Sequence, residues 1–73
     1  MKIKPTNDGK NKLLLKLCAL REKRGITTRR LASDAGFHQS LWVLYEKGTR
    51  NPTWENLFAA AKALELKVEI DVT

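Results

Sequence analysis

The segment from residue 27 to residue 48 constrains the fold more than any other part of the chain. Its first half carries small and aliphatic residues at helical spacing, namely Leu31, Ala32 and Ala35. Gly36 interrupts this pattern, and Trp42 and Tyr45 then stand three residues apart, as on one face of a second helix. The segment therefore predicts two short helices joined by a glycine turn.

The ends of these two helices are also marked in the sequence. Thr27 offers a hydroxyl that can cap the first helix, and Gly36 supplies the positive φ of a tight turn. The second helix is expected from about His38 to Lys47, and Gly48 ends it.

Two further helices flank this pair. The first is expected over Lys12 to Arg24, and its apolar residues are Leu13, Leu14, Leu17, Cys18 and Leu20. Thr53 is expected to cap the last helix, with an inner face of Trp54, Leu57, Phe58, Ala61 and Leu64. Residues 1–11 are rich in lysine and include the turn-forming pair Asp8-Gly9, so we expect a mobile basic arm before a domain over residues 12–65.

The end of the chain, residues 66–73, has the pattern of a strand. Apolar residues alternate with charged ones, and they are Leu66, Val68, Ile70 and Val72. A lone strand leaves backbone groups unpaired, so we expect the same strand of a second subunit to pair with it and to make a homodimer. Pairing with Lys2-Ile3-Lys4 of the chain's own arm is the main alternative, and a frayed tail is another.

Composition narrows the range of functions. The chain has 73 residues and a net charge of +6, which favours a polyanionic partner such as nucleic acid, and a basic solvated surface is the alternative. One cysteine and one histidine provide neither an internal disulfide nor a set of zinc ligands. The sequence contains no apolar run of membrane-spanning length and no signal-peptide core. We expect a soluble cytoplasmic protein with no membrane partner.

The order of motifs resembles the Cro and phage-repressor (XRE) family of helix-turn-helix domains over roughly residues 13 to 66. The matching residues are Leu20-Arg21-Glu22, Gly25-Ile26-Thr27, Leu31-Ala32, Gly36-Phe37, Trp42, Tyr45-Glu46-Lys47-Gly48, Arg50-Asn51-Pro52, Leu57 and Ala61-Lys62-Ala63-Leu64. The resemblance implies an all-α, lambda-repressor-like bundle of four or five helices whose third helix enters the DNA major groove. The terminal strand is also similar to that of HipB-type antitoxins, whose subunits join through an intermolecular sheet.

The resemblance also implies roles for single residues. Arg21 and Glu46 are expected to form a partly buried ion pair between the first and third helices. Gln39 and Ser40 are expected at base edges, where glutamine can bond adenine through N6 and N7. Leu44 shares their outward face, where it would contact thymine methyl groups or, with Val43, form a protein-binding surface.

The remaining DNA contacts are expected at phosphates. The candidates are Thr27, Thr28, Arg29, Arg30, His38, Lys47, Thr49, Arg50 and Asn51. Thr27 can serve as a helix cap at the same time, and His38 stands where the family usually has a Ser or Thr cap. Many members carry glutamine at the position of Thr28, so the resemblance supplies no partner that would orient Gln39.

The sequence thus predicts a DNA-binding transcriptional regulator, a homodimeric repressor of a palindromic operator that can also serve as the antitoxin of a toxin–antitoxin pair. A protein adaptor that uses the same fold to bind a partner such as a toxin is the alternative. The sequence offers no nucleophile–base set, metal site or phosphate loop, so it predicts neither an enzyme nor a cofactor.

Overall fold

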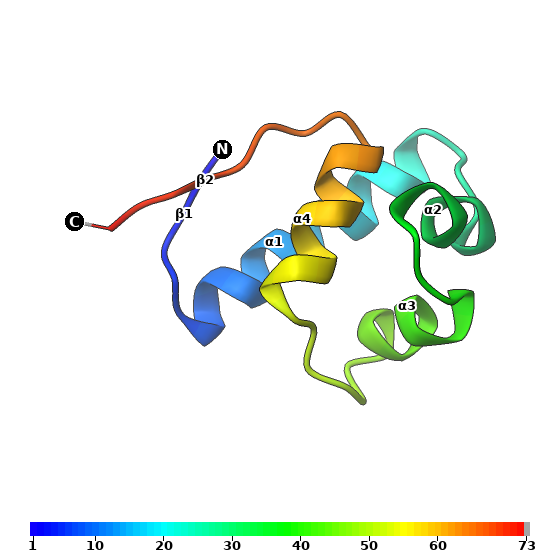
Figure 1. Ribbon diagram of the computed structural model, residues 1–73, viewed down its shortest axis with the longest axis horizontal. Coiled ribbons are helices and arrows are strands. Elements are labelled where there is room, and N and C mark those ends of the chain that lie inside the picture. Colours follow the sequence, from blue (N-terminus) through cyan, green and yellow to red (C-terminus); the bar gives the residue numbers. More distant parts are fainter. Residues whose placement is uncertain (73) are drawn as a thin grey trace.

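The computed structural model describes residues 1–72 and is mainly helical. Its elements, in order, are β1 (Lys2–Ile3), α1 (Asn7–Lys23), α2 (Thr28–Ala35), α3 (Gln39–Glu46), α4 (Trp54–Ala63) and β2 (Glu69–Ile70) (Figure 1). The two strands lie at one end of the long axis, and α2 and α3 lie toward the other. The helical bundle predicted from the sequence is confirmed. No helix within residues 1–72 is long and apolar enough to cross a membrane.

One apolar core joins all four helices to β1. Its buried residues are Ile3, Leu13, Leu17, Leu31, Trp42, Tyr45, Leu57, Ala60, Ala61 and Leu64. The fully buried Trp42 ring stacks on Phe37 and meets Tyr45 edge-on, with ring centroids 5.9 Å apart in both pairs. Trp54 and Phe58 were expected on the inner face of α4, but they are only half-buried and stack on each other. Trp54 packs against the edge of the core.

The first helix begins earlier than its apolar pattern suggests. α1 begins at Asn7 rather than at Lys12, because the Thr6 hydroxyl accepts a hydrogen bond from the Gly9 N–H at 3.1 Å and caps the helix. The pair Asp8-Gly9 therefore lies in the first helical turn and makes no loop.

Gly9 leaves space for the backbone of Lys4 to pass close to α1. A Cβ at this position would lie 1.9 Å from the Lys4 carbonyl oxygen, so the chain before the helix crosses α1 where only glycine leaves room. Ile3 is 3% exposed and belongs to the core. Residues 2–4 are thus packed on the bundle, and the expectation of a mobile arm over residues 1–11 was wrong for this segment.

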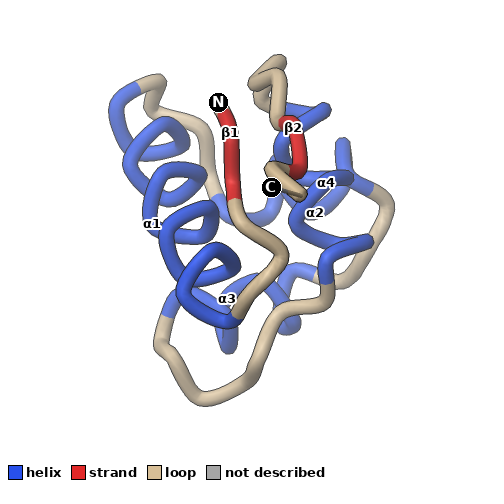
Figure 2. Tube along the Cα trace, turned by 90° about the vertical axis from the view of Figure 1, so that its left-hand side faces the viewer, coloured by secondary structure: helices blue, strands red, loops and turns tan. Residues whose placement is uncertain are grey.

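The two ends of the described chain form a parallel two-stranded sheet. Ile3 is in register with Ile70, and Figure 2 shows β1 between α1 and β2. The Met1 nitrogen donates to the Lys67 carbonyl oxygen at 3.0 Å, and the Asp71 N–H donates to the Ile3 carbonyl oxygen at 2.8 Å. The C-terminal strand therefore pairs with the chain's own arm, which the sequence offered as an alternative. Only Glu69–Ile70 is strand; Thr73 lies outside the described residues.

Candidate nucleic-acid interface

The pair α2 and α3 meets at a left-handed residue, as the sequence predicts. Gly36 has φ 89°, and its N–H donates to the Ala32 carbonyl oxygen at 2.8 Å. Phe37 follows and packs against the core. Thr28 is the first residue of α2, and Gln39 is the first residue of α3.

A partly buried polar network fixes α3 to α1. The Arg21 guanidinium donates from Nε and Nη2 to the two carboxylate oxygens of Glu46, each at 2.8 Å. The remaining Nη1 donates to the Ile26 carbonyl oxygen at 2.9 Å, and the indole Nε1 of Trp42 donates to Glu46 Oε2. The bonds to Glu46 raise the pKa of the Arg21 guanidinium. This network is the ion pair expected from the resemblance, and it links α1, α3 and the loop before α2.

Gln39 is held by a residue for which the sequence gave no role in orientation. Its Nε2 donates to Thr28 Oγ1 at 3.0 Å. One amide hydrogen and the carbonyl oxygen of Gln39 then remain for a further partner, and this donor–acceptor pair matches N7 and N6 of adenine. Because Thr28 accepts this bond, its own hydroxyl hydrogen is free to point at another acceptor. Thr28, at the position where many family members have glutamine, thus supplies an acceptor for the Gln39 amide in this chain.

The start of α2 combines a cap with two arginines. Thr27 Oγ1 accepts from the Arg30 N–H at 3.1 Å, which confirms the predicted cap. Arg29 and Arg30 are exposed, and Arg30 lies 3.7 Å from Asp34 one turn later. This long contact between exposed groups is weak, so both arginines can still bind an anion.

His38 occupies the cap position of α3 without acting as a cap. Its side chain makes no capping hydrogen bond and is exposed. His38 therefore does not take over the side-chain cap that the family usually has here, and its predicted contact to phosphate stays a prediction.

The loop after α3 brings together the other predicted phosphate contacts. All four candidates are exposed: Lys47, Thr49, Arg50 and Asn51. The Thr49 hydroxyl and N–H both donate to the Leu44 carbonyl oxygen, at 3.2 Å and 3.1 Å, so this threonine also closes the end of α3. Beyond the loop, Asn56 Nδ2 donates to the Tyr45 hydroxyl at 2.8 Å and ties α4 to α3. Asn56 was missed because only its position in space, and not the spacing along the chain, reveals its partner.

The outward face of α3 is mixed in character. Gln39 and Ser40 are exposed, and Leu44 is 36% exposed one turn after Ser40. Leu41 and Val43 are half-buried, and Leu41 packs against the core. The apolar surface available on this face is therefore mostly that of Leu44.

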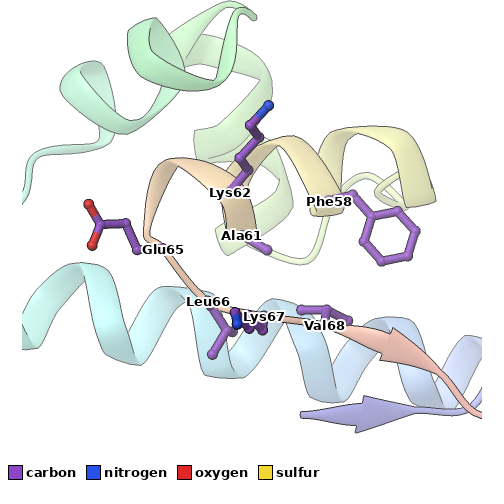
Figure 3. A pocket seen from close by; sticks show the side chains of 7 residues that line it. All are labelled: Phe58, Ala61, Lys62, Glu65, Leu66, Lys67 and Val68. Carbon is purple, nitrogen blue, oxygen red and sulfur yellow. The ribbon is translucent and has the colours of Figure 1, made fainter.

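The four predicted subunit-contact residues lie apart from this face, in the segment that contains β2. Leu66 and Val68 are half-buried and pack against the core of their own chain (Figure 3). Ile70 is in β2, and Val72 is 83% exposed. The pattern that suggested a subunit interface is thus partly explained by packing within the chain.

Comparison with known proteins agrees with this geometry. A family model described as a helix-turn-helix domain matches residues 13–71. This region contains α2, α3, α4 and most of α1. No curated protein matches the chain significantly. Because the matched region covers most of the sequence and contains the helix pair α2 and α3, the chain belongs to the helix-turn-helix family of DNA-binding domains.

Proposed function

We propose that this protein is a homodimeric, sequence-specific DNA-binding regulator that represses transcription by occupying a palindromic operator. The observation that carries the proposal is the hydrogen bond from Gln39 to Thr28 at the start of α3. It orders an exposed amide on a helix whose angle is fixed by the Arg21 and Glu46 network. An ordered donor–acceptor pair of this kind suits direct reading of a base edge.

In the proposed complex, α3 enters the major groove with its N-terminal turn toward the bases. Gln39 accepts from N6 of an adenine and donates to its N7, Ser40 bonds a neighbouring edge, and Leu44 contacts a thymine methyl group. A bidentate contact of this type contributes about 1–3 kcal/mol of discrimination between bases.

Phosphates on both sides of the groove are proposed to hold the helix in register. The groups involved are Thr27, Thr28, Arg29, Arg30, His38, Lys47, Thr49, Arg50 and Asn51. The Thr28 hydroxyl then joins the two kinds of contact, because it accepts from Gln39 and donates its own hydrogen to a phosphate. A shift of the DNA backbone would then move Thr28 and disturb the orientation of the Gln39 amide at the base.

Two copies would read half-sites about 34 Å apart, one turn of the duplex, and the occupied operator would exclude the transcription machinery. The proposed subunit contact uses the segment that contains Leu66, Val68, Ile70 and Val72.

Selection from a pool of random duplexes tests the proposal. We expect a palindromic consensus with adenine in each half-site, and an affinity that falls steeply with salt because phosphates are neutralised. Gln39→Ala should relax the base preference at that adenine while it keeps most of the overall affinity, and the exposed Ser33→Ala in α2 is a matched control. Equal affinity for selected and scrambled duplexes at moderate salt would contradict the proposal.

A further inference from the structure

The Gln39 amide has two groups of opposite polarity available for a base, and Thr28 fixes their order. Nε2 donates one hydrogen to Thr28 Oγ1 at 3.0 Å, so its second hydrogen and the oxygen Oε1 remain at the exposed side chain. A base edge that pairs with both groups must hold an acceptor beside a donor, as adenine does with N7 and N6. The contact therefore depends on one particular hydrogen of the adenine amino group.

That hydrogen lies in the major groove. The adenine N6 amino group carries two hydrogens, of which one bonds to thymine within the base pair and the other lies on the N7 side and faces the groove. An N6-methyl group leaves a single hydrogen, and base pairing requires it. The methyl group then occupies the N7 side, so N6-methyladenine presents carbon at the position of the donor and shields N7.

We propose that N6-methylation of the adenine read by Gln39 blocks this contact, so that the protein distinguishes methylated from unmethylated operators. This inference rests on the adenine contact of the proposed function and adds its regulation by a modification of the DNA. With the methyl group present, Oε1 loses its donor and lies against carbon. An acceptor that is removed from water without a hydrogen-bond partner lowers the affinity.

Reversal of the Gln39 amide does not restore the contact. It would direct Nε2 toward the methyl group, which cannot accept a hydrogen bond, and Oε1 toward Thr28. The Thr28 hydroxyl would then have to donate to Gln39 and give up the hydrogen that is proposed for a phosphate. Both orientations of the amide thus lose a hydrogen bond to the DNA.

Movement of α3 away from the methyl group is restricted as well. The Arg21 guanidinium and the Trp42 indole both donate to Glu46 and fix the helix to α1. Trp42 belongs to the first turn of α3, as Gln39 does, and its side chain is fully buried. The start of the helix therefore cannot withdraw from the groove without disturbing the core.

The proposed twofold symmetry gives methylation a graded effect. In a palindromic operator, the adenine of one half-site lies on one strand and its symmetric counterpart lies on the other. Methylation of one strand then affects one Gln39 of the dimer, and methylation of both strands affects both. Because the two contacts are about 34 Å apart, their free-energy losses should add and their effects on affinity should multiply.

Competition binding with the duplex selected from the random pool tests the proposal. We expect the wild-type affinity to fall about tenfold or more when one strand carries N6-methyladenine, and about a hundredfold or more when both strands do. Gln39→Ala should bind all three duplexes equally, because it lacks the amide that the methyl group obstructs. Ser33→Ala in α2 is the matched control and should respond as the wild type does. A duplex methylated at an adenine outside the consensus should bind like unmethylated DNA.

Equal wild-type affinity for methylated and unmethylated duplexes would overturn the inference, and a base preference that Gln39→Ala still relaxes would leave the proposed function supported. Equal losses in the wild type and in Gln39→Ala would also overturn the inference, because the methyl group would then act through the shape of the DNA. A preference for adenine that Gln39→Ala does not relax would instead contradict the base contact of the proposed function, and this inference with it.

Discussion

The pair α2 and α3 and the sheet of β1 and β2 are held in place by different kinds of contact. The helix pair is held by side chains, through the Arg21 and Glu46 network and through Gln39 on Thr28. The terminal sheet is held by backbone hydrogen bonds and by the close crossing at Gly9. Specific side chains can be recognised in a sequence, whereas backbone pairing between distant segments leaves little trace there. Local side-chain signals thus predict the helix pair, whereas the partner of a terminal strand depends on how the whole chain packs.

The largest effect is expected where the side-chain network is broken. Glu46→Ala leaves the Arg21 guanidinium and the Trp42 N–H without their carboxylate, in a site where the Arg21 side chain is only 13% exposed. We expect the free energy of unfolding to fall by about 3–5 kcal/mol, as measured by urea denaturation. The exposed Glu55→Ala in α4 is the control and should change stability by less than about 0.5 kcal/mol. A loss no greater than that of the control would mean that the network does not hold α3.

The next effect should appear in the terminal sheet. Alanine normally stabilises a helix relative to glycine, but Gly9→Ala puts a methyl group against the Lys4 carbonyl. We expect a loss of about 1–3 kcal/mol and faster hydrogen exchange at the amides of Glu69 and Asp71, which bond to the Met1 and Ile3 carbonyl oxygens. Asn11→Ala on exposed α1 is the control. A gain in stability would show that the arm is not packed at this crossing.

The helix pair and the terminal sheet also differ in how accurately the sequence predicted them. The helix pair was predicted almost to the residue, because Thr27 and Gly36 act on their own neighbours. The start of α1 was placed too late, because Asp8-Gly9 has the local signature of a turn although the Thr6 hydroxyl caps the helix just before it. The sequence favoured the same strand of a second subunit as the partner of β2, whereas the structure shows the alternative, pairing with β1 of the same chain. Hydrophobic alternation indicates a strand but does not identify its neighbour.

The candidate site shows the same limit. The identity of Gln39 and its position after the turn predicted a base-reading residue, and that role remains a prediction. The bond to Thr28 was not predicted, because the angle between the two helices decides whether a hydroxyl reaches the amide. The tie from Asn56 to Tyr45 was missed for the same reason.

A smaller effect should follow removal of the Thr28 hydroxyl. Thr28→Val keeps the shape of the side chain but cannot accept from Gln39, so the amide loses its orientation. We expect discrimination at the adenine to fall by about 1 kcal/mol, roughly fivefold in relative affinity, with fold stability little changed. Thr28→Ser keeps the acceptor and should retain the preference. Equal discrimination by all three proteins in competition binding would remove Thr28 from the reading of bases.

The smallest effect is expected at the boundary between the helical bundle and the terminal segment. Glu65 has φ 56°, a left-handed conformation that favours glycine, and the next N–H, that of Leu66, bonds back to the Ala61 carbonyl oxygen at 2.8 Å. Glu65→Gly should therefore raise the free energy of unfolding by about 0.5–1 kcal/mol in thermal or urea denaturation. Lys62→Gly, one turn earlier in α4, should lower it by a similar amount. Destabilisation at Glu65 would show that its side chain makes contacts worth more than the strain.

The most direct test of the central claim, that Gln39 reads an adenine edge, changes one atom of the DNA. In the selected duplex, 7-deazaadenine replaces the adenine of each half-site and so removes the N7 acceptor while base pairing is kept. We predict that the affinity of the wild-type protein falls about fivefold or more per half-site, whereas that of Gln39→Ala does not change. Equal losses in the two proteins, or no loss in either, would contradict the account.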